Sequence, residues 1–338
     1  MTQAARLLAT GFVVDRPGEG SVFPSAGGNS ADPKVQAIYW RCIAVLFASA
    51  RITNPALPLA LFTNAVPPKV DGIDLGRLFD RLEVQVRHVP LTARLDQSKT
   101  PMWGNVLYFL DILESVAASA QANQHFALLD SDVVVTAPLD PLFDRLDDCD
   151  FIGYAVDTPI DTLVNGMTSR EMAAVATASD GILRDTVTHF GGELFATSSA
   201  AWRREGPRFG ELFARAARDT GDAAAIRTEE HLWSIVLAQL GDRVMLGNDI
   251  LKRIWTSPRY RTAEPGDQNL PLWHLPAEKR FGFVDLFRDL ARKGFPAEMD
   301  PAEFKAMALA RFGLPRPSPA KVLRDGARHL AIRLGRFI

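Results

Sequence analysis

Regular alternation between extended apolar runs and helix-like segments is the feature of this sequence that most limits its fold. Strand-like runs lie at 9–14, 57–63, 82–86 and 126–129. Between them, around 39–50 and 103–117, apolar residues recur at three- and four-residue steps, which is the spacing of one helix face. This order predicts an α/β protein with a mixed, mainly parallel sheet and helices on both of its faces.

The alternation becomes looser after Pro141. Strand-like runs follow at 151–156 and 190–196, and helix-like segments follow at 208–217 and 229–240. The last part is helical in character and is interrupted by Pro296 and Pro301, and the proline-rich stretch 314–319 predicts a stiff linker. We therefore expect a first half at 1–150, a second half at 151–285 on the same sheet, and a helical extension at 286–338.

Charge and cysteine content exclude several classes of protein. The 338 residues carry a formal net charge of -2, so the basic field expected of a nucleic-acid-binding protein is missing. The two cysteines, Cys42 and Cys149, form no C-x-x-C spacing, which argues against a disulfide framework and a cysteine-rich zinc site. The start of the chain is too short and irregular in its apolar stretch for a signal peptide or a membrane span. A soluble protein of a reducing, cytoplasmic compartment is expected.

The C-terminal segment 321–338 differs in charge from the rest of the chain. It carries five basic residues and one acidic residue, and its apolar residues Leu323, Leu330, Leu334 and Phe337 share one helical face. A basic amphipathic helix of this kind can lie on an anionic membrane surface. A helix docked on its own domain accounts for the same pattern, and both interpretations remain open at this stage.

An acidic turn between two apolar runs carries the most information about chemistry. Asp130 and Asp132 lie between the runs 126–129 and 133–135, so the backbone on both sides is expected to be buried strand. Two carboxylates in such surroundings need a cation, and carboxylate oxygens suit Mg²⁺ or Mn²⁺. A site with few protein ligands leaves positions for substrate phosphates, which predicts a nucleotide diphosphate held through the metal. The alternative is a strand end whose aspartates only cap a turn.

The segment 128–143, LLDSDVVVTAPLDPLF, resembles the D-x-D segment of nucleotide-sugar glycosyltransferases of the GT-A fold. Three further segments, 61–64, 103–113 and 190–195, resemble other parts of that fold, and the resemblance spans roughly residues 7 to 285. It implies that Asp132 chelates the metal and that Asp130 contacts the ribose and the metal. It also implies that 1–150 binds the nucleotide sugar, most simply a UDP-sugar, and that 151–285 binds the acceptor.

The segment 273–280, WHLPAEKR, is similar to the H-x-x-G-x-x-K-P-W segment of the glycogenin and lipopolysaccharide galactosyltransferase branch, although it lacks the Gly and the Pro-Trp. The resemblance implies that His274 completes the metal site. Lys279 or Arg280 would then neutralise the diphosphate leaving group. A core or rim histidine is the alternative interpretation of His274.

Two glutamates are candidates for the residue that faces the sugar. Thr228-Glu229-Glu230-His231-Leu232 resembles the D-E-S-H-L segment of the blood-group and α-1,3-galactosyl transferases, which implies that Glu229 is a nucleophile or oxocarbenium stabiliser in a retaining transfer. Helix capping by Thr228 explains the same residues without catalysis. Glu193, after two glycines, could instead bind acceptor hydroxyls or act as the base of an inverting transfer.

Taken together, these residues predict a Mn²⁺- or Mg²⁺-dependent glycosyltransferase that acts on a cell-surface glycan or glycolipid precursor at the cytoplasmic face of the membrane. One rival is a phosphatase of the haloacid-dehalogenase type, because 130–134 also fits its D-x-D-x-[TV] signature, with Asp242 and Asp249 as the later acidic pair. A carbohydrate-binding protein that keeps the fold without turnover is the other rival.

Overall fold

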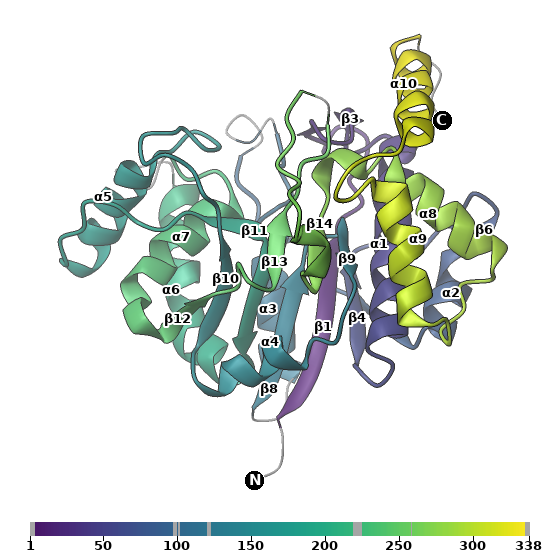
Figure 1. The fold of residues 1–338 in the computed structure, drawn as a ribbon. Helices are drawn as coiled ribbons and strands as arrows, with labels where there is room; N and C mark the ends of the chain where they lie inside the picture. The colour runs from purple at the N-terminus through teal and green to yellow at the C-terminus, as the bar shows by residue number, and fades with distance from the viewer. Residues whose placement is uncertain are drawn as a thin grey trace.

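A mixed sheet forms the centre of the computed structural model, which describes residues 4–96, 100, 102–119, 123–218, 225–257 and 259–334. Its strands are β1 (Ala5–Phe12), β4 (Leu59–Thr63), β7 (Val84–His88), β8 (Gln124–Leu129), β10 (Phe151–Ala155), β11 (Phe190–Ser198) and β12 (Val244–Leu246). Within the described residues they form a seven-stranded sheet in the order β12-β10-β11-β8-β1-β4-β7 (Figure 1). Only the pairs of β11 with β8 and β10 are antiparallel in this sheet. The predicted mixed, mainly parallel sheet is confirmed.

Helices cover both faces of this sheet, as predicted. In chain order they are α1 (Pro33–Thr53), α2 (Leu75–Arg81), α3 (Tyr108–Ser119), α4 (Asp140–Asp144), α5 (Ser169–Asp180), α6 (Ser199–Ala217), α7 (Glu229–Leu240), α8 (Gly282–Arg292), α9 (Pro301–Phe312) and α10 (Pro319–Arg333). One layer holds α1, α2, α8 and α9, and the other holds α3, α5, α6 and α7 (Figure 1). Alternate residues of β4 enter the two cores, Leu59 and Leu61 on one face and Ala60 and Phe62 on the other.

Local sequence explains where the longest helix begins. The Asp32 side chain accepts a hydrogen bond from the Lys34 amide, and Pro33 occupies the first turn, where its missing amide hydrogen has no cost. By length and composition α1 could cross a membrane, alone among the helices of the described residues. Its apolar stretch is 89% buried inside the fold, as in the core helix of a globular protein.

A second, smaller sheet holds the acidic turn in place. In the described part of the chain it contains three strands, β13 (Leu251–Arg253), β14 (Leu272–His274) and β9 (Val133–Val135). The register pairs His274 with Val133 on one side and with Arg253 on the other. Three short strands far apart in the sequence thus bring the end of the acidic turn, His274 and Arg253 together. The remaining strands form two short hairpins, β2 (Val22–Phe23) with β3 (Gly28–Asn29) and β5 (Lys69–Val70) with β6 (Ile73–Asp74).

Several boundaries differ from the sequence prediction. The first strand spans 5–12 rather than 9–14, and the helix expected from Trp103 begins at Tyr108. Helix α6 begins at Ser199 rather than Arg208, because the Ser198 side chain caps it and Pro207 lies inside it instead of ending it. Pro301 begins α9 instead of breaking a helix, with Asp300 as the N-cap.

The predicted C-terminal helix is α10, which follows the proline-rich stretch (Figure 1). Its basic residues contact the protein itself: the Lys321 ammonium lies 2.8 Å from Glu278, and both Arg324 and Arg328 pair with Asp285. These ion pairs support the docked-helix interpretation for the basic face. The apolar residues Leu323, Leu330 and Leu334 are 75%, 60% and 67% exposed. The fourth, Phe337, lies outside the described residues.

Candidate metal centre and adjoining cavity

The acidic turn joins the end of β8 to the start of β9. The Val133 amide donates to the Asp130 carbonyl at 3.3 Å and closes the turn, while the Asp130 amide donates to the Glu193 carbonyl at 3.2 Å. The Leu275 amide donates to the Asp132 carbonyl at 3.1 Å. These bonds leave the Asp130 side chain 49% exposed and the Asp132 side chain fully buried. One carboxylate therefore faces open space, and the other lies beneath it.

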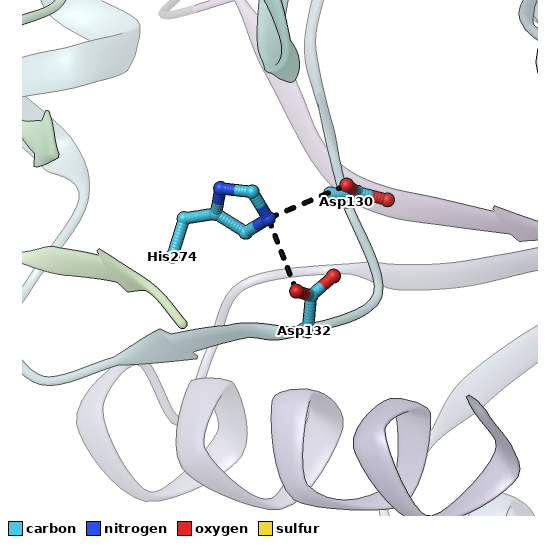
Figure 2. Close-up of side chains that lie close together, drawn as sticks. All are labelled: Asp130, Asp132 and His274. Atoms are coloured by element: carbon cyan, nitrogen blue, oxygen red, sulfur yellow. Dashed lines mark ion pairs between the residues drawn. The ribbon is translucent and has the colours of Figure 1, made fainter. Parts of the chain in front are cut away.

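His274 joins the two aspartates (Figure 2). Its Nε2 atom lies 3.1 Å from Asp132 Oδ2 and 3.4 Å from Asp130 Oδ2. One ligand atom from each residue lies within 4.8 Å of the others. Asp132 Oδ1 and His274 Nε2 are buried and make no hydrogen bond within the described structure. Two carboxylates and one imidazole, with buried ligand atoms that make no hydrogen bond, fit a divalent cation, and this donor set suits Mn²⁺ or Mg²⁺.

Lys279 also contacts the buried aspartate. Its ammonium pairs with Asp132 Oδ2 and lies 5.7 Å from the ring centroid of Tyr39. Burial alone would raise the pKa of Asp132, but Lys279 and His274 outweigh it and hold that pKa well below its ordinary value. Burial opposes the charge on His274, yet the Asp132 and Glu193 carboxylates raise its pKa well above the ordinary value. The two cations keep Asp132 ionised inside the protein.

A cavity of about 400 Å³ adjoins this cluster. Its lining includes Asp130, His274 and Lys279 and the first turn of α7. Aromatic rings form much of the rest of the wall, from Phe12, Phe23, Tyr39, Trp103, Tyr108, Phe109, Trp233 and Trp255. The volume and the apolar wall with a few convergent polar groups are typical of a small-molecule site.

Glu229 lines this cavity. The residue is half-buried, but its Oε2 atom is buried and makes no hydrogen bond to any described residue. Burial raises the pKa of Glu229 well above its ordinary value, and the neighbouring Glu230 adds to the shift. A Cβ atom at Gly192 would lie 2.4 Å from Glu229 Oε1, so the glycine leaves room for this side chain.

Glu193 has a different environment, although it also lines the cavity. Both of its carboxylate oxygens are bound by Arg253, and Oε1 also lies 3.0 Å from His274 Nδ1. Burial would raise the pKa of Glu193, but Arg253 and His274 hold it well below the ordinary value. A carboxylate with these partners and this low pKa is a poor proton acceptor, so the contacts favour a supporting role over that of a base.

Arg253 is the site residue that the sequence reasoning missed. It lies on the short strand β13 and also donates to Glu230 Oε1 at 2.8 Å, which holds the pKa of Glu230 down at about 2 despite the opposing effect of burial. No motif surrounds Arg253, and only the pairing of β13 with β14 brings it to the site.

Arg280 lies beside Gly27, where an added Cβ would come within 2.4 Å of its guanidinium, and it is not part of the cavity lining.

Comparison with known proteins finds matches among solved structures. No family model matches the chain, and no curated protein matches it either. The chain is similar in structure to the three glycosyltransferases that follow, each at a TM-score below 0.5. The galactosyltransferase LgtC in complex with donor and acceptor sugar analogs matches at 12% identity and a TM-score of 0.45, over 89% of this chain and 95% of that one. Mouse xyloside xylosyltransferase 1 matches at 10% identity and a TM-score of 0.48, over 80% of this chain and 98% of that one. The WbbM bifunctional glycosyltransferase matches at 12% identity and a TM-score of 0.46, over 81% of this chain and 46% of that one.

Proposed function

We propose that this protein is a metal-dependent glycosyltransferase that moves a sugar from a nucleotide diphosphate, most simply UDP, to a glycan or glycolipid acceptor. The observation that carries the proposal is the cluster of Asp130, Asp132 and His274 beside an aromatic-walled cavity, with the Lys279 ammonium next to it. Carboxylates alone would repel a diphosphate, whereas carboxylates that hold a divalent cation attract one.

The metal cluster, Lys279 and Glu229 have different parts in this proposal. Asp130, Asp132 and His274 would hold Mn²⁺ or Mg²⁺, which supplies positive charge to the diphosphate as it leaves. Lys279 neutralises the same leaving group from the protein side. Glu229, which lines the same cavity, contacts the sugar. Its raised pKa favours the protonated carboxyl group, which donates a hydrogen bond to a sugar hydroxyl, whereas a nucleophilic role in a retaining transfer requires the ionised carboxylate.

The phosphatase alternative has less support. In such an enzyme the later acidic pair joins the first aspartates at the metal, but Asp249 is paired with Arg145 and neither Asp242 nor Asp249 lines the described cavity. A binding protein without turnover would keep the same cluster. Product formation by the parent protein and its loss in Asp132→Ala separate that alternative from an enzyme.

Thermal unfolding with UDP and other nucleoside diphosphates, each with Mn²⁺ and again with EDTA, tests the donor class. A ligand at 100 times its Kd stabilises the folded state by about 2.7 kcal/mol, which raises the melting temperature by a few degrees. A shift that needs both one nucleotide and the metal supports the proposal. No shift with any nucleotide, despite a cooperative transition, contradicts it.

Two substitutions of Glu229 separate its possible roles. Glu229→Gln keeps a hydrogen-bond donor of the same shape, and Glu229→Ala removes it. If Glu229 only positions the sugar, Gln should retain much of the transfer rate that Ala loses. If the ionised carboxylate acts on the anomeric carbon, both variants should lose the rate equally, and the configuration of the product, read by NMR, should show retention.

We further propose that the protein acts in the cytoplasm at the inner face of the membrane. Two free buried cysteines support a reducing compartment, and the exposed residues Leu323, Leu330 and Leu334 support contact of α10 with the membrane. Sedimentation with phosphatidylglycerol vesicles tests the contact, with the triple Leu→Ser variant as the comparison. Equal binding of parent and variant would refute it.

A further inference from the structure

A chain of buried charges connects the metal centre to the N-terminus of α7. It runs from Asp132 through His274 to Glu193, from Glu193 to Arg253, and from Arg253 to Glu230. All five side chains have low exposure, from 0% for Asp132 and Glu193 to 21% for Arg253. Buried charges are costly unless they are paired, and here each charge has a partner of opposite sign.

Glu193 contacts the side of the imidazole that faces away from the aspartates. Its Oε1 atom lies 3.0 Å from His274 Nδ1, while Nε2 points at Asp130 and Asp132 (Figure 2). A carboxylate at Nδ1 accepts a hydrogen bond from the N–H of that nitrogen, so the proton stays on Nδ1. In the neutral imidazole the lone pair is then on Nε2, the nitrogen that faces the cluster. Carboxylate partners of this kind orient metal-ligating histidines and raise their basicity.

Arg253 holds Glu193 in the required orientation. Its guanidinium binds both oxygens of Glu193, with Nη2 at 2.7 Å from Oε2, and the same Nη2 donates to Glu230 at 2.8 Å. Strand β11, which carries Glu193, leaves space for the pair at Gly191: a Cβ atom there would lie 2.0 Å from Glu193 Oε2 and 2.7 Å from Arg253 Nη2. Two-point binding by a planar guanidinium fixes the plane of the carboxylate as well as its position.

We infer that Glu193 is a positioning residue for the metal ligand His274 and that Arg253 clamps Glu193 in place. The inference rests on the proposed metal site and deepens it. Glu193 was one of two candidates for a residue that acts on the sugar, and its contacts assign it to the metal centre instead. Glu229, whose Oε2 atom has no partner within the described residues, is then the carboxyl group that faces the sugar.

The test is the Mn²⁺ affinity of the full chain, measured by electron paramagnetic resonance of free and bound Mn²⁺ without nucleotide. Glu193→Gln keeps the shape and removes the charge, so it should weaken Mn²⁺ binding by about 10- to 100-fold. The spin-echo modulation from a coordinated ¹⁴N nucleus should also weaken at equal occupancy, because the imidazole is no longer held. Arg253→Lys keeps one charge and loses the two-point contact, so it should give a smaller loss in the same direction.

Glu205→Gln is the matched control. Glu205 is 3% exposed and is bound by Arg204, Arg208 and Arg243, so it is a buried glutamate held by arginines that does not line the cavity. Its variant should bind Mn²⁺ within twofold of the parent. If Glu193→Gln and Arg253→Lys do so too, or if Glu205→Gln weakens binding as much as they do, the inference is refuted while the metal site stands. If the parent itself binds no Mn²⁺, the proposed metal site is refuted and the inference with it.

Discussion

Replacing Lys279 by methionine tests how the protein keeps a carboxylate charged in its interior. The Lys279 ammonium pairs with Asp132, and the side chains are 6% and 0% exposed. Methionine keeps the length of the stem and removes the charge. Asp132 would then be left with His274 as its remaining cationic partner among the described residues, next to Asp130.

The expected loss of stability follows from this burial. Removing one partner of a buried ion pair costs about 3–5 kcal/mol. The entropy of unfolding is about 2.1 cal/mol/K per residue, so for 338 residues 1 kcal/mol corresponds to roughly 1.4 °C. Lys279→Met should therefore lower the melting temperature by about 4–7 °C when no metal is added.

Differential scanning calorimetry in EDTA checks this value. Lys279→Met/Asp132→Asn should recover much of the loss, because no unpaired carboxylate remains. The control is Lys252→Met. Lys252 pairs with Glu264 and Asp267, but its side chain is 25% exposed, so this variant should lose no more than about 1 kcal/mol of its free energy of unfolding. A melting temperature for Lys279→Met within 1 °C of the parent, or no recovery in the double variant, would refute the reasoning.

Three further predictions concern single residues. Burial raises the pKa of Glu229 above its ordinary value of 4.5, so the folded state loses stability as pH rises above about 4.5, and glutamine does not titrate. Glu229→Gln should therefore raise the melting temperature by more at pH 7 than at pH 5; equal differences at both pH values, measured by calorimetry, would contradict this. Gly192→Ala should lower kcat without changing the Mn²⁺ affinity, because the new Cβ displaces Glu229. Gly210→Ala is the control and should leave kcat unchanged, because no heavy atom lies within 4 Å of the added Cβ. A parent-like kcat in Gly192→Ala would count against the placement of Glu229. His231 accepts a hydrogen bond from the Arg227 amide, and burial lowers its pKa, so the protein should lose stability as pH falls below about 6.5. In thermal melts, His231→Gln should lose less stability than the parent between pH 7.5 and pH 5.5. The same fall in melting temperature in both proteins would exclude His231 as a source of the pH dependence.

The sequence by itself determined the architecture and the acidic turn. Both follow from local pattern: hydrophobic periodicity distinguishes strand from helix, and two aspartates between apolar runs mark a turn at the end of a buried strand. The boundaries of helices were less predictable where a residue departed from its usual role. Proline usually ends a helix, but Pro207 lies inside α6.

Only the tertiary structure decided how the site residues divide their roles. Glu193 and Glu229 were equivalent candidates in the sequence, and they differ because Arg253 and His274, 60 and 81 residues from Glu193, meet it through the pairing of β13 with β14. Glu229 has no such partner for its Oε2 atom among the described residues, and burial raises its pKa. The charge of a buried carboxyl group depends on desolvation and on which cations approach it, and both are set by contacts between segments far apart in the chain.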